Sequence, residues 1–228
     1  MKKFLYRYYR KFKKKNFTII VSVVSVARII LFKKLLDNTR SLSGDIVECG
    51  VGASRTFQQL AILLQLLEPK RKLWGFDSFE GFPEPSTRDW SIRNVQKGER
   101  KDMTVAQVLE TLRTVGVHPE TLKRVILIKG FFSNTLPQTK IEKIVLLHLD
   151  VDLYESYKIC LEQLYPKVVE GGVIIFDEYI DDIKKWPGAS RAIDEFFGEQ
   201  KKFIQKDAMT GKYYFIKRNK RNTVLSRA

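Results

Sequence analysis

The chain has 228 residues, 44% of them hydrophobic, which is enough for one substantial core and does not require a second domain. Its formal net charge is +15, but residues 1–36 hold 11 Lys or Arg and residues 208–228 hold six, with no acid in either span. The span between them has 24 basic and 26 acidic residues. A groove that follows a nucleic-acid backbone needs basic residues spread over the folded body, so this distribution argues against a specific nucleic-acid partner.

The N-terminal segment combines positive charge with apolar residues. Eight Lys or Arg within residues 1–16 precede an apolar run from Phe17 to Ala27 that loosely resembles an export signal. This run has 11 residues, whereas a membrane-spanning helix needs about 20. Polar residues recur in and just after it at helical spacing, which predicts an amphipathic helix that covers the domain as a lid or lies on a membrane surface.

We expect three parts along the chain. Residues 1–43 form a basic segment with the amphipathic helix, residues 44–218 form the folded domain, and residues 219–228 form a basic tail. Cys49 and Cys160 lie in apolar surroundings, and two thiols cannot make the dense disulfide framework of a small secreted fold. We therefore expect a cytoplasmic protein, with peripheral contact at the inner membrane surface as a further hypothesis for the N-terminal segment.

From residue 45 onward, short apolar runs alternate with helical patterns, which is typical of a parallel sheet covered by helices. Each short run is mostly apolar, as expected for strands that are buried on both faces. The predicted strands cover residues 45–49, 72–76, 125–129, 144–149 and 173–176. The predicted helices cover residues 56–67, 104–115, 157–164 and 189–197.

Two more apolar runs follow the last predicted helix. Residues 203–205 and 213–216 flank the turn sequence Met-Thr-Gly at residues 209–211, which predicts an antiparallel hairpin at the end of the sheet. Residues 81–100 are rich in Pro, Gly and charge and predict a long loop. Long loops in compact domains often cover functional sites.

The end of the first predicted strand carries an acid and two glycines, within the sequence IVECGVGAS at residues 46–54. Gly50 and Gly52 allow a tight turn and a close approach of ligand to backbone, while Glu48 offers a carboxylate to a cationic or hydroxyl group. Asp77 ends the second strand, where such folds place a carboxylate that accepts hydrogen bonds from ribose hydroxyls. Short turns of this kind also occur without a ligand, so the first motif alone leaves a purely structural role open.

Residue 55 distinguishes between two nucleotide cofactors. A dinucleotide-binding turn needs a third glycine there, so that the helix packs tightly and presents its N-terminus to a pyrophosphate, but the residue is Arg55. S-Adenosylmethionine has no phosphate and carries positive groups, which an acid at Glu48 suits better. The pattern favours S-adenosylmethionine and keeps an NAD-dependent oxidoreductase as the alternative.

Four acids follow two successive predicted strands, Asp150 and Asp152 after the fourth and Asp177 and Glu178 after the fifth. The carboxyl ends of parallel strands meet at one edge of a sheet, where these carboxylates would repel each other and resist ionisation without a cation. Mg²⁺ prefers oxygen ligands, so the pattern favours a divalent-cation site. The alternative is a helix cap at Asp150 with solvated acids elsewhere. His148 is interpreted as a buried core residue.

Several sequence blocks together resemble the macrocin-type O-methyltransferases, a family that modifies sugars of macrolides and polysaccharides. The blocks are GDIVECGVG (44–52), LWGFDSFEGFPEP (73–85), KGFFSNTLP (129–137), LDVDLYES (149–156), LYPKVVEGGVIIFDEY (164–179) and WPGASRAIDEFF (186–197). They occur in the order of the family and cover about residues 44–200. The resemblance implies an α/β fold of the Rossmann-like class I methyltransferase type, with a mostly parallel seven-stranded sheet and a C-terminal antiparallel hairpin.

The resemblance also implies S-adenosylmethionine as cofactor. The turn at residues 48–52 would hold its methionine part, Asp77 its ribose, and the loop near residues 130–133 would border its adenine. The implied cofactor-binding residues are Glu48, Gly50, Gly52, Ser54, Asp77, Ser78, Gly130, Phe131 and Phe132. The family commonly has further glycines where this chain has Ala53 and Ser54, so the contacts of that turn are expected to differ.

For the acidic cluster, the resemblance implies that Asp150, Asp177 and Glu178 bind Mg²⁺ or another divalent cation, although the family usually has a second Asp at the position of Glu178. Asp150 would also be the catalytic residue that takes the proton of the acceptor hydroxyl. We therefore expect a metal-dependent O-methyltransferase that acts on a sugar or another vicinal-diol acceptor, a small molecule or a glycan. A second alternative is a non-enzymatic adaptor that binds a membrane or nucleic acid through its basic ends. Homo-oligomer formation is left open.

Overall fold

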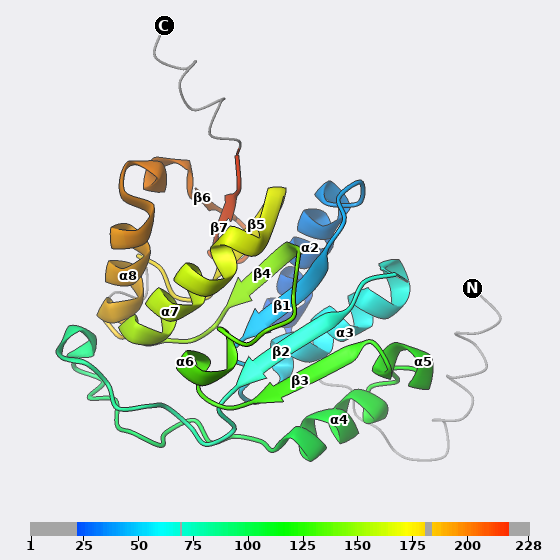
Figure 1. Cartoon of the computed structure of the whole chain (residues 1–228), viewed down its shortest axis with the longest axis horizontal. Coiled ribbons are helices and arrows are strands. Elements are labelled where there is room, and N and C mark those ends of the chain that lie inside the picture. The colour runs from blue at the N-terminus through cyan, green and yellow to red at the C-terminus, as the bar shows by residue number, and fades with distance from the viewer. Residues whose placement is uncertain (1–21, 69, 181–183, 219–228) are drawn as a thin grey trace, which may run out of the picture.

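The computed structural model describes residues 22–68, 70–180 and 184–218. A seven-stranded sheet with the strand order β3-β2-β1-β4-β5-β7-β6 lies between layers of helices (Figure 1). The strands are β1 (Asp45–Cys49), β2 (Leu73–Asp77), β3 (Val125–Lys129), β4 (Ile144–Leu149), β5 (Val168–Phe176), β6 (Gln205–Lys206) and β7 (Tyr213–Ile216). The helices are α2 (Val23–Asn38), α3 (Arg55–Leu67), α4 (Val105–Thr114), α5 (Pro119–Leu122), α6 (Phe132–Thr135), α7 (Tyr154–Leu164) and α8 (Pro187–Phe197). Strands β1 to β5 pair in parallel.

The sheet confirms the predicted α/β fold with a mostly parallel sheet and an antiparallel C-terminal hairpin. Strands β1 to β4 lie within one residue of their predicted positions. Strand β5 begins earlier than predicted, because Val168 pairs with Ile144 before an irregular step in the register. The hairpin adds β7 antiparallel to β5 and places the short β6 at the edge.

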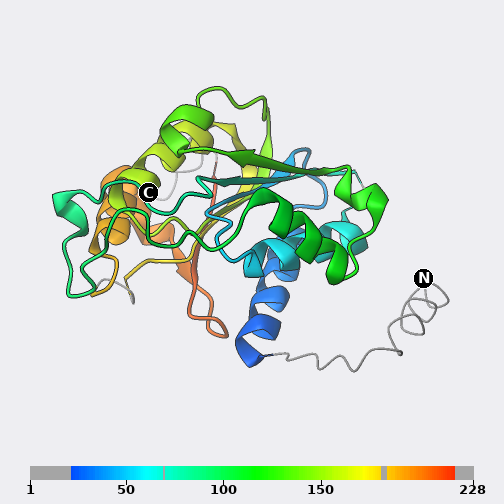
Figure 2. The ribbon, with the colours of Figure 1, turned by 90° about the horizontal axis from the view of Figure 1, so that it is seen from below.

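Two helical layers cover the opposite faces of the sheet (Figure 2). Buried residues of α2, α3 and α4 form one apolar cluster with inward side chains of the strands, and residues of α7 and α8 form the other. Central strand β4 is buried along its whole length, which explains why His148 is its one polar residue. The polar ends of the strands are therefore the parts that remain accessible to a ligand.

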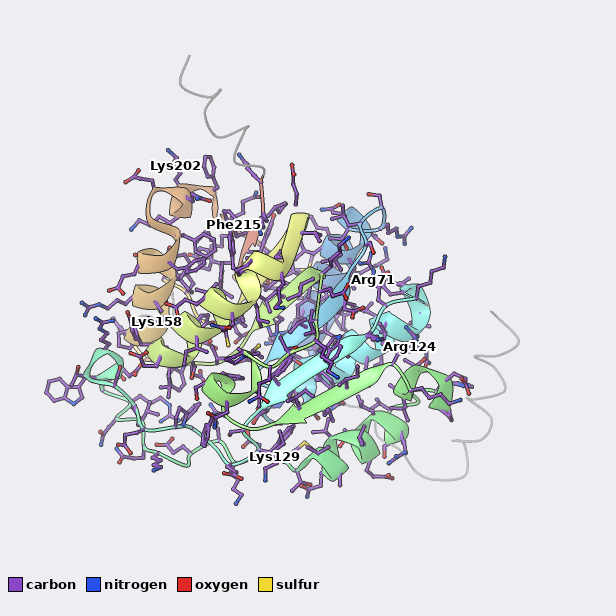
Figure 3. The ribbon with its side chains drawn as sticks, viewed as in Figure 1. Arg71, Arg124, Lys129, Lys158, Lys202 and Phe215 are labelled. Atoms are coloured by element: carbon purple, nitrogen blue, oxygen red, sulfur yellow. The ribbon has the colours of Figure 1, made fainter. Side chains whose placement is uncertain are left out.

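Two arginines lie beside the amino ends of β1 to β3, and Figure 3 shows both on the side of the sheet where these strands begin. The guanidinium of Arg71 donates to the carboxylate of Glu68 at 2.6 Å and to three carbonyls of the connection between α2 and β1. Arg124 donates to the carbonyls of Glu68 at 2.8 Å and Arg71 at 2.6 Å. The Arg71 guanidinium is thus well supplied with acceptors, whereas Oε1 of Glu68 is buried and accepts no hydrogen bond from the described residues.

Helix α2, which lies in the expected basic N-terminal segment of residues 1–43, packs into the core. It begins after Ser22, whose hydroxyl accepts a hydrogen bond from the Ser25 backbone at 3.1 Å, and the predicted run at residues 17–21 lies outside the described residues. One face of α2 buries Leu31, Phe32, Leu35 and Leu36. Its first turns leave a second apolar face exposed, made of Val23, Val24, Val26 and Ile30.

Across the described ranges, no helix has both the length and the apolar character needed to cross a membrane.

Replacing Phe32 by Ala tests whether α2 is an integral part of the domain. Phe32 is 1% exposed, and a large-to-small change in a packed core costs about 3–5 kcal/mol. We expect denaturant unfolding to report a loss of that size, while Lys34→Ala on the exposed side of the same helix changes the free energy of unfolding by less than about 0.5 kcal/mol. Equal stability of the two variants would mean that α2 can leave the sheet at no cost.

Candidate active site

A cavity of about 910 Å³ opens at the carboxyl edge of the sheet. Its lining includes the turns that follow β1, β2, β4 and β5, together with the loop at residues 81–102. The strand order reverses direction between β1 and β4, and open parallel sheets bind ligands at such a reversal point. The volume lies in the usual range for small-molecule sites.

Gly50 brings two of these turns into contact. Its φ is +87°, and a Cβ atom there would lie 1.7 Å from the carbonyl oxygen of Asp150. Glycine is therefore the residue that this position requires, because any side chain would push the turns after β1 and β4 apart. As a result, the backbone of the expected cofactor turn after β1 touches the backbone of the expected metal turn after β4.

Asp77 anchors the first turn from the neighbouring strand. Its Oδ2 accepts a hydrogen bond from the Gly52 amide at 2.9 Å, and its Oδ1 accepts one from the Phe79 amide at 2.7 Å. Burial raises the pKa of the Asp77 carboxyl, and these backbone donors oppose that shift. The carboxylate lines the cavity and still has lone pairs for a ligand.

The predicted cofactor residues divide into two groups. Those that line the cavity are Gly50, Gly52, Asp77, Ser78, Phe131 and Phe132. Glu48, Ser54 and Gly130 lie outside the lining within the described part of the chain. Ser54 is fully buried, and its hydroxyl takes part in hydrogen bonds with Gln58 and Met103, so its side chain serves the start of α3.

Glu48 is fully buried beneath the turn, where one carboxylate oxygen lies 2.9 Å from Nδ1 of His148. Burial raises the pKa of the Glu48 carboxyl, and His148 opposes that shift. Burial lowers the pKa of His148, but the neighbouring carboxylates of Asp177 and Glu48 outweigh burial and raise the value to about 9. The interpretation of His148 as a buried core residue is confirmed, and it pairs with an acid that the sequence assigned to cofactor contact.

Three of the four predicted acids converge at the carboxyl ends of β4 and β5. One carboxylate oxygen each of Asp150, Asp177 and Glu178 lies within 4.8 Å of the other two. Burial and the neighbouring acids raise the pKa of Asp150 and of Glu178. Oxygen ligands this close, whose ionisation a positive charge would favour, fit a single divalent cation.

Asp152, which the sequence placed beside the cluster, also lines the cavity. Its backbone has φ +59°, a strained conformation for a residue with a side chain. Burial raises its pKa to about 7, against the opposing charge of Arg100. The neighbouring Glu178 carboxylate accepts a hydrogen bond from the Tyr157 hydroxyl at 2.9 Å, which fixes its orientation.

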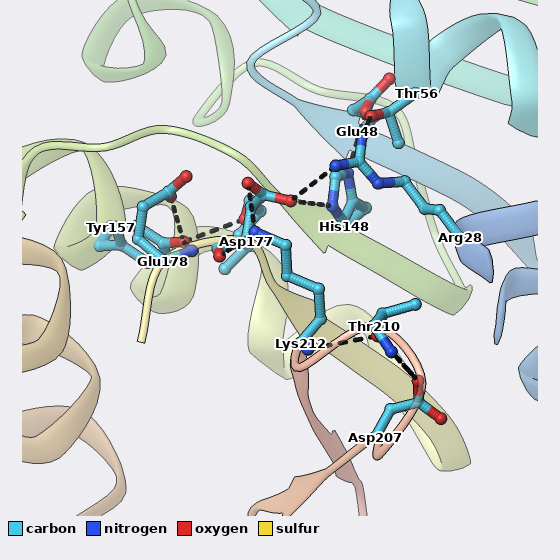
Figure 4. A network of polar contacts seen from close by, with 11 residues as sticks. Arg28, Glu48, Thr56, His148, Tyr157, Asp177, Glu178, Asp207, Thr210 and Lys212 are labelled. Atoms are coloured by element: carbon cyan, nitrogen blue, oxygen red, sulfur yellow. Dashed lines mark hydrogen bonds and ion pairs between the residues drawn. The ribbon is translucent and has the colours of Figure 1, made fainter. Parts of the chain in front are cut away.

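Asp177 has three cationic neighbours, which Figure 4 shows around its carboxylate. Nζ of Lys212 lies 2.8 Å from Oδ2, Nε2 of His148 lies 3.8 Å from Oδ1, and Nη2 of Arg28 lies 4.0 Å from Oδ1. Burial raises the pKa of Asp177, but His148 and Lys212 outweigh burial and hold it below its ordinary value. Asp177 is therefore ionised while its neighbours Asp150 and Glu178 resist ionisation.

Sequence reasoning missed Arg28 and Lys212, both of which line the cavity. Arg28 comes from α2 and also donates to the hydroxyl of Thr56 at 2.8 Å, but in the sequence it was only one polar position of a helix. Lys212 counted as part of the basic C-terminal end. The sequence does show that Lys212 comes immediately before the last predicted strand. It does not show which strand that one pairs with, and so it does not place Lys212 beside Asp177.

The predicted long loop does border the site, through residues such as Phe82, Ile92 and Arg93. Asp89 anchors it, because its Oδ1 accepts a hydrogen bond from the Tyr154 amide at 2.7 Å. The Arg93 guanidinium lies 4.9 Å from the ring centroid of Trp186, which closes the same end of the cavity. The loop is thereby attached to α7 and to the start of α8.

The sheet order and the cavity at its reversal point define the Rossmann-like class of α/β methyltransferase folds, and comparisons with known proteins agree. The sequence model described as macrocin-O-methyltransferase matches residues 14–211. A tetracenomycin rhamnosyl 4′-O-methyltransferase from Streptomyces olivaceus is 32% identical over 170 residues, 69% of this chain and 65% of the relative. Demethyldecarbamoylnovobiocin O-methyltransferase from Streptomyces niveus is 30% identical over 158 residues, 68% of this chain and 59% of the relative.

Solved structures extend the similarity. The calicheamicin methyltransferase CalS11 has a TM-score of 0.69 at 25% identity, over 84% of this chain and 79% of that chain. The O-methyltransferase NovP has a TM-score of 0.72 at 24% identity, over 85% of this chain and 81% of that chain, and supports the fold alone. The chain belongs to the macrocin O-methyltransferase family. It spans about two thirds of the length of the first relative and less of the second.

A double-mutant cycle tests the buried pair of Glu48 and His148. In His148→Leu, the Glu48 carboxylate is left buried without its partner, which we expect to cost about 3–5 kcal/mol of stability. The double variant Glu48→Leu with His148→Leu removes both groups and should be more stable than the single His148→Leu variant. Denaturant unfolding without cofactor measures all four states, and a double variant less stable than both single ones would contradict the pairing.

Proposed function

We propose that this protein is an S-adenosylmethionine-dependent O-methyltransferase that methylates a hydroxyl of a sugar or another vicinal-diol acceptor and requires Mg²⁺ or another divalent cation. The observation that carries the proposal is a single cavity that joins the turn anchored by Asp77 to the cluster of Asp150, Asp177 and Glu178. Family membership supports the methyl transfer, and the three carboxylates support the cation.

The cofactor is proposed to lie at the β1 and β2 end of the cavity. Both oxygens of Asp77 already hold backbone amides, and each keeps a lone pair for a ribose hydroxyl. The turn from Gly50 to Gly52 brings backbone close to the ligand, and the ring of Phe131 borders the place proposed for the adenine. Arg55 stands where a dinucleotide site needs glycine, which continues to disfavour the NAD-dependent alternative. A protein of similar fold, the methyltransferase PaMTH1 from Podospora anserina, has a crystal structure with SAH bound.

Methyl transfer from a sulfonium is an in-line displacement, so the protein has to align the methyl carbon with the acceptor oxygen and make that oxygen nucleophilic. A divalent cation bound by Asp150, Asp177 and Glu178 would supply the positive charge that lowers the pKa of an acceptor hydroxyl. Asp150, which is half-buried and whose carbonyl oxygen lies at the contact with Gly50, is proposed to accept the proton with its carboxylate. The same contact places the proposed cofactor turn beside the proposed acceptor site.

A sugar is the proposed acceptor class. The Streptomyces olivaceus relative is named for a rhamnosyl group, and CalS11 is described as a TDP-rhamnose 3′-O-methyltransferase. Adjacent hydroxyls of a sugar offer two oxygens to one cation, which fixes orientation as well as reactivity. A catechol has the same arrangement of oxygens and is the second candidate to assay.

A cytoplasmic enzyme with peripheral membrane contact is also part of the proposal. The exposed apolar face of α2, made of Val23, Val24, Val26 and Ile30, supports such contact, together with the positive charge of residues 1–16. Vesicle sedimentation tests it directly. Light scattering tests the other use of such a face, which is contact with a second copy of the chain.

Replacing Asp77 by Ala tests the cofactor assignment. The change removes hydrogen bonds to a charged group, which are worth about 1.5–3 kcal/mol, so we expect S-adenosylmethionine affinity to fall by roughly 10–150-fold in calorimetry. Asp45→Ala is the control, because Asp45 also accepts two N–H bonds, from Lys72 and Trp74, at the opposite edge of the sheet. A folded Asp77→Ala protein with the affinity of the parent would refute the ribose assignment, and tighter binding of NAD would favour the alternative.

Replacing Asp150 by Asn tests the metal and proton roles together. Turnover on a diol acceptor should fall roughly 10²–10⁴-fold, as for loss of a general base, with S-adenosylmethionine affinity largely kept. A chelator should abolish turnover of the parent, and added Mg²⁺ should restore it. Asp194→Asn is the control, since Asp194 pairs with Tyr179 and Lys201 outside the cavity. Full methyl transfer in chelator would remove the metal from the mechanism.

A further inference from the structure

The C-terminal hairpin delivers a lysine to one of the proposed metal ligands. Strand β7 pairs antiparallel with β5 so that Tyr213 lies opposite Phe176. The next pair along this register is Lys212 opposite Asp177. Nζ of Lys212 donates to the Asp177 carbonyl oxygen at 2.7 Å and to Oδ2 of its carboxylate at 2.8 Å (Figure 4). One ammonium group therefore fixes both the backbone and the side chain of Asp177.

The turn that presents Lys212 is held by its own hydrogen bonds. The Asp207 amide donates to the Lys212 carbonyl at 2.8 Å, and the Asp207 carboxylate accepts from the amide and the hydroxyl of Thr210, both at 2.8 Å. Gly211 has φ +70° and donates to the Asp207 carbonyl at 2.9 Å. These hydrogen bonds, some of which Figure 4 shows, hold the backbone of the turn and so restrict the position of the Lys212 Cα atom.

The two oxygens of Asp177 differ in their partners. Oδ2 receives the hydrogen bond of Lys212, whereas Oδ1 is buried and accepts no hydrogen bond from the residues that the structure describes. Arg28 and His148 attract Oδ1 from 4.0 and 3.8 Å, beyond hydrogen-bond distance. One carboxylate oxygen of Asp177 lies within 4.8 Å of an oxygen of Asp150 and of Glu178, so a rotation of the Asp177 carboxylate would change its place in this cluster.

We propose that Lys212 is a positioning residue, which holds Oδ2 of Asp177 so that Oδ1 is left for a divalent cation shared with Asp150 and Glu178. The inference rests on the metal dependence in the proposed function. Metal-binding carboxylates are commonly held by such outer hydrogen bonds, whose loss lowers metal affinity by about 10–100-fold. The last strand of the sheet thereby completes a site whose ligands all lie earlier in the chain.

If Lys212 acted only through its charge, removing it would change Mg²⁺ affinity in the opposite direction. An ammonium group beside a metal site repels the ion, so a merely electrostatic role means that removing Lys212 tightens metal binding. A merely structural role, as an anchor of the hairpin, means that removal lowers stability and leaves metal affinity unchanged. Removal of Lys212 should therefore lower Mg²⁺ affinity if the residue positions Asp177, raise it if the role is only electrostatic, and leave it unchanged if the role is only structural.

The test is calorimetric titration of Mg²⁺ alone into the full chain, its Lys212→Met and Lys212→Arg variants, and Lys217→Met as the matched control. Lys217 lies just after the same strand and donates to the carbonyls of Tyr165 and Val168 at 3.0 and 2.8 Å, outside the cavity lining. We expect Lys212→Met to lower Mg²⁺ affinity roughly 10–100-fold. Lys212→Arg should recover part of the affinity, and Lys217→Met should match the parent.

Unchanged or tighter Mg²⁺ binding by a folded Lys212→Met protein would overturn the inference, and thermal unfolding of each variant establishes folding. S-Adenosylmethionine affinity, measured on the same samples, should be equal in all four proteins. A parent that binds S-adenosylmethionine but no Mg²⁺ would overturn both the metal proposal and this inference, and leave the methyltransferase proposal standing. A parent that binds Mg²⁺ but no S-adenosylmethionine would refute the cofactor assignment, while the lysine variants would still decide the role of Lys212.

Discussion

The close contact between Gly50 and the Asp150 backbone is the constraint on which the site depends. It lies where the strand order reverses, between the adjacent strands β1 and β4, and a Cβ at residue 50 would come within 1.7 Å of a carbonyl oxygen. Because the turns touch there, the carboxylate of Asp77 and the acids after β4 and β5 line one cavity. A larger residue at this point would separate the turns after β1 and β4, to which we assign the cofactor and the acceptor in the proposed function.

The second constraint is electrostatic. Parallel strands bring their carboxyl ends together, so Asp150, Asp177 and Glu178 are crowded within a few ångströms and partly buried. The protein offsets this crowding unevenly. Asp177 receives positive charge from Lys212, Arg28 and His148, whereas Asp150 and Glu178 have raised pKa values that a bound cation would lower. This asymmetry is compatible with the proposed cation site, because a positive charge beside Asp150 and Glu178 would favour their ionised forms.

The parts of the chain farthest apart in sequence meet at Asp177. Helix α2 supplies Arg28 and packs Phe32 edge-on against the ring of His148, with ring centroids 5.4 Å apart, while the C-terminal hairpin supplies Lys212. Two basic residues from opposite ends of the described chain, Arg28 and Lys212, thus lie beside the same carboxylate. Helix α2 also helps to bury one face of the sheet, through residues such as Leu31, Phe32 and Leu35.

The sequence by itself determined the parallel strands, the C-terminal hairpin and the acids after β4 and β5. Apolar runs, turn residues and strand-end acids are local patterns, and the carboxyl ends of parallel strands must share one edge. The tertiary structure decided which side chains face the cavity. Glu48 and Ser54 are buried beneath the turn that they belong to, because side chains alternate in direction and α3 packs closely, whereas Arg28 and Lys212 reach Asp177. Those contacts depend on the packing of α2 and on the register of β7 against β5, which join residues more than 30 positions apart and have no local signature.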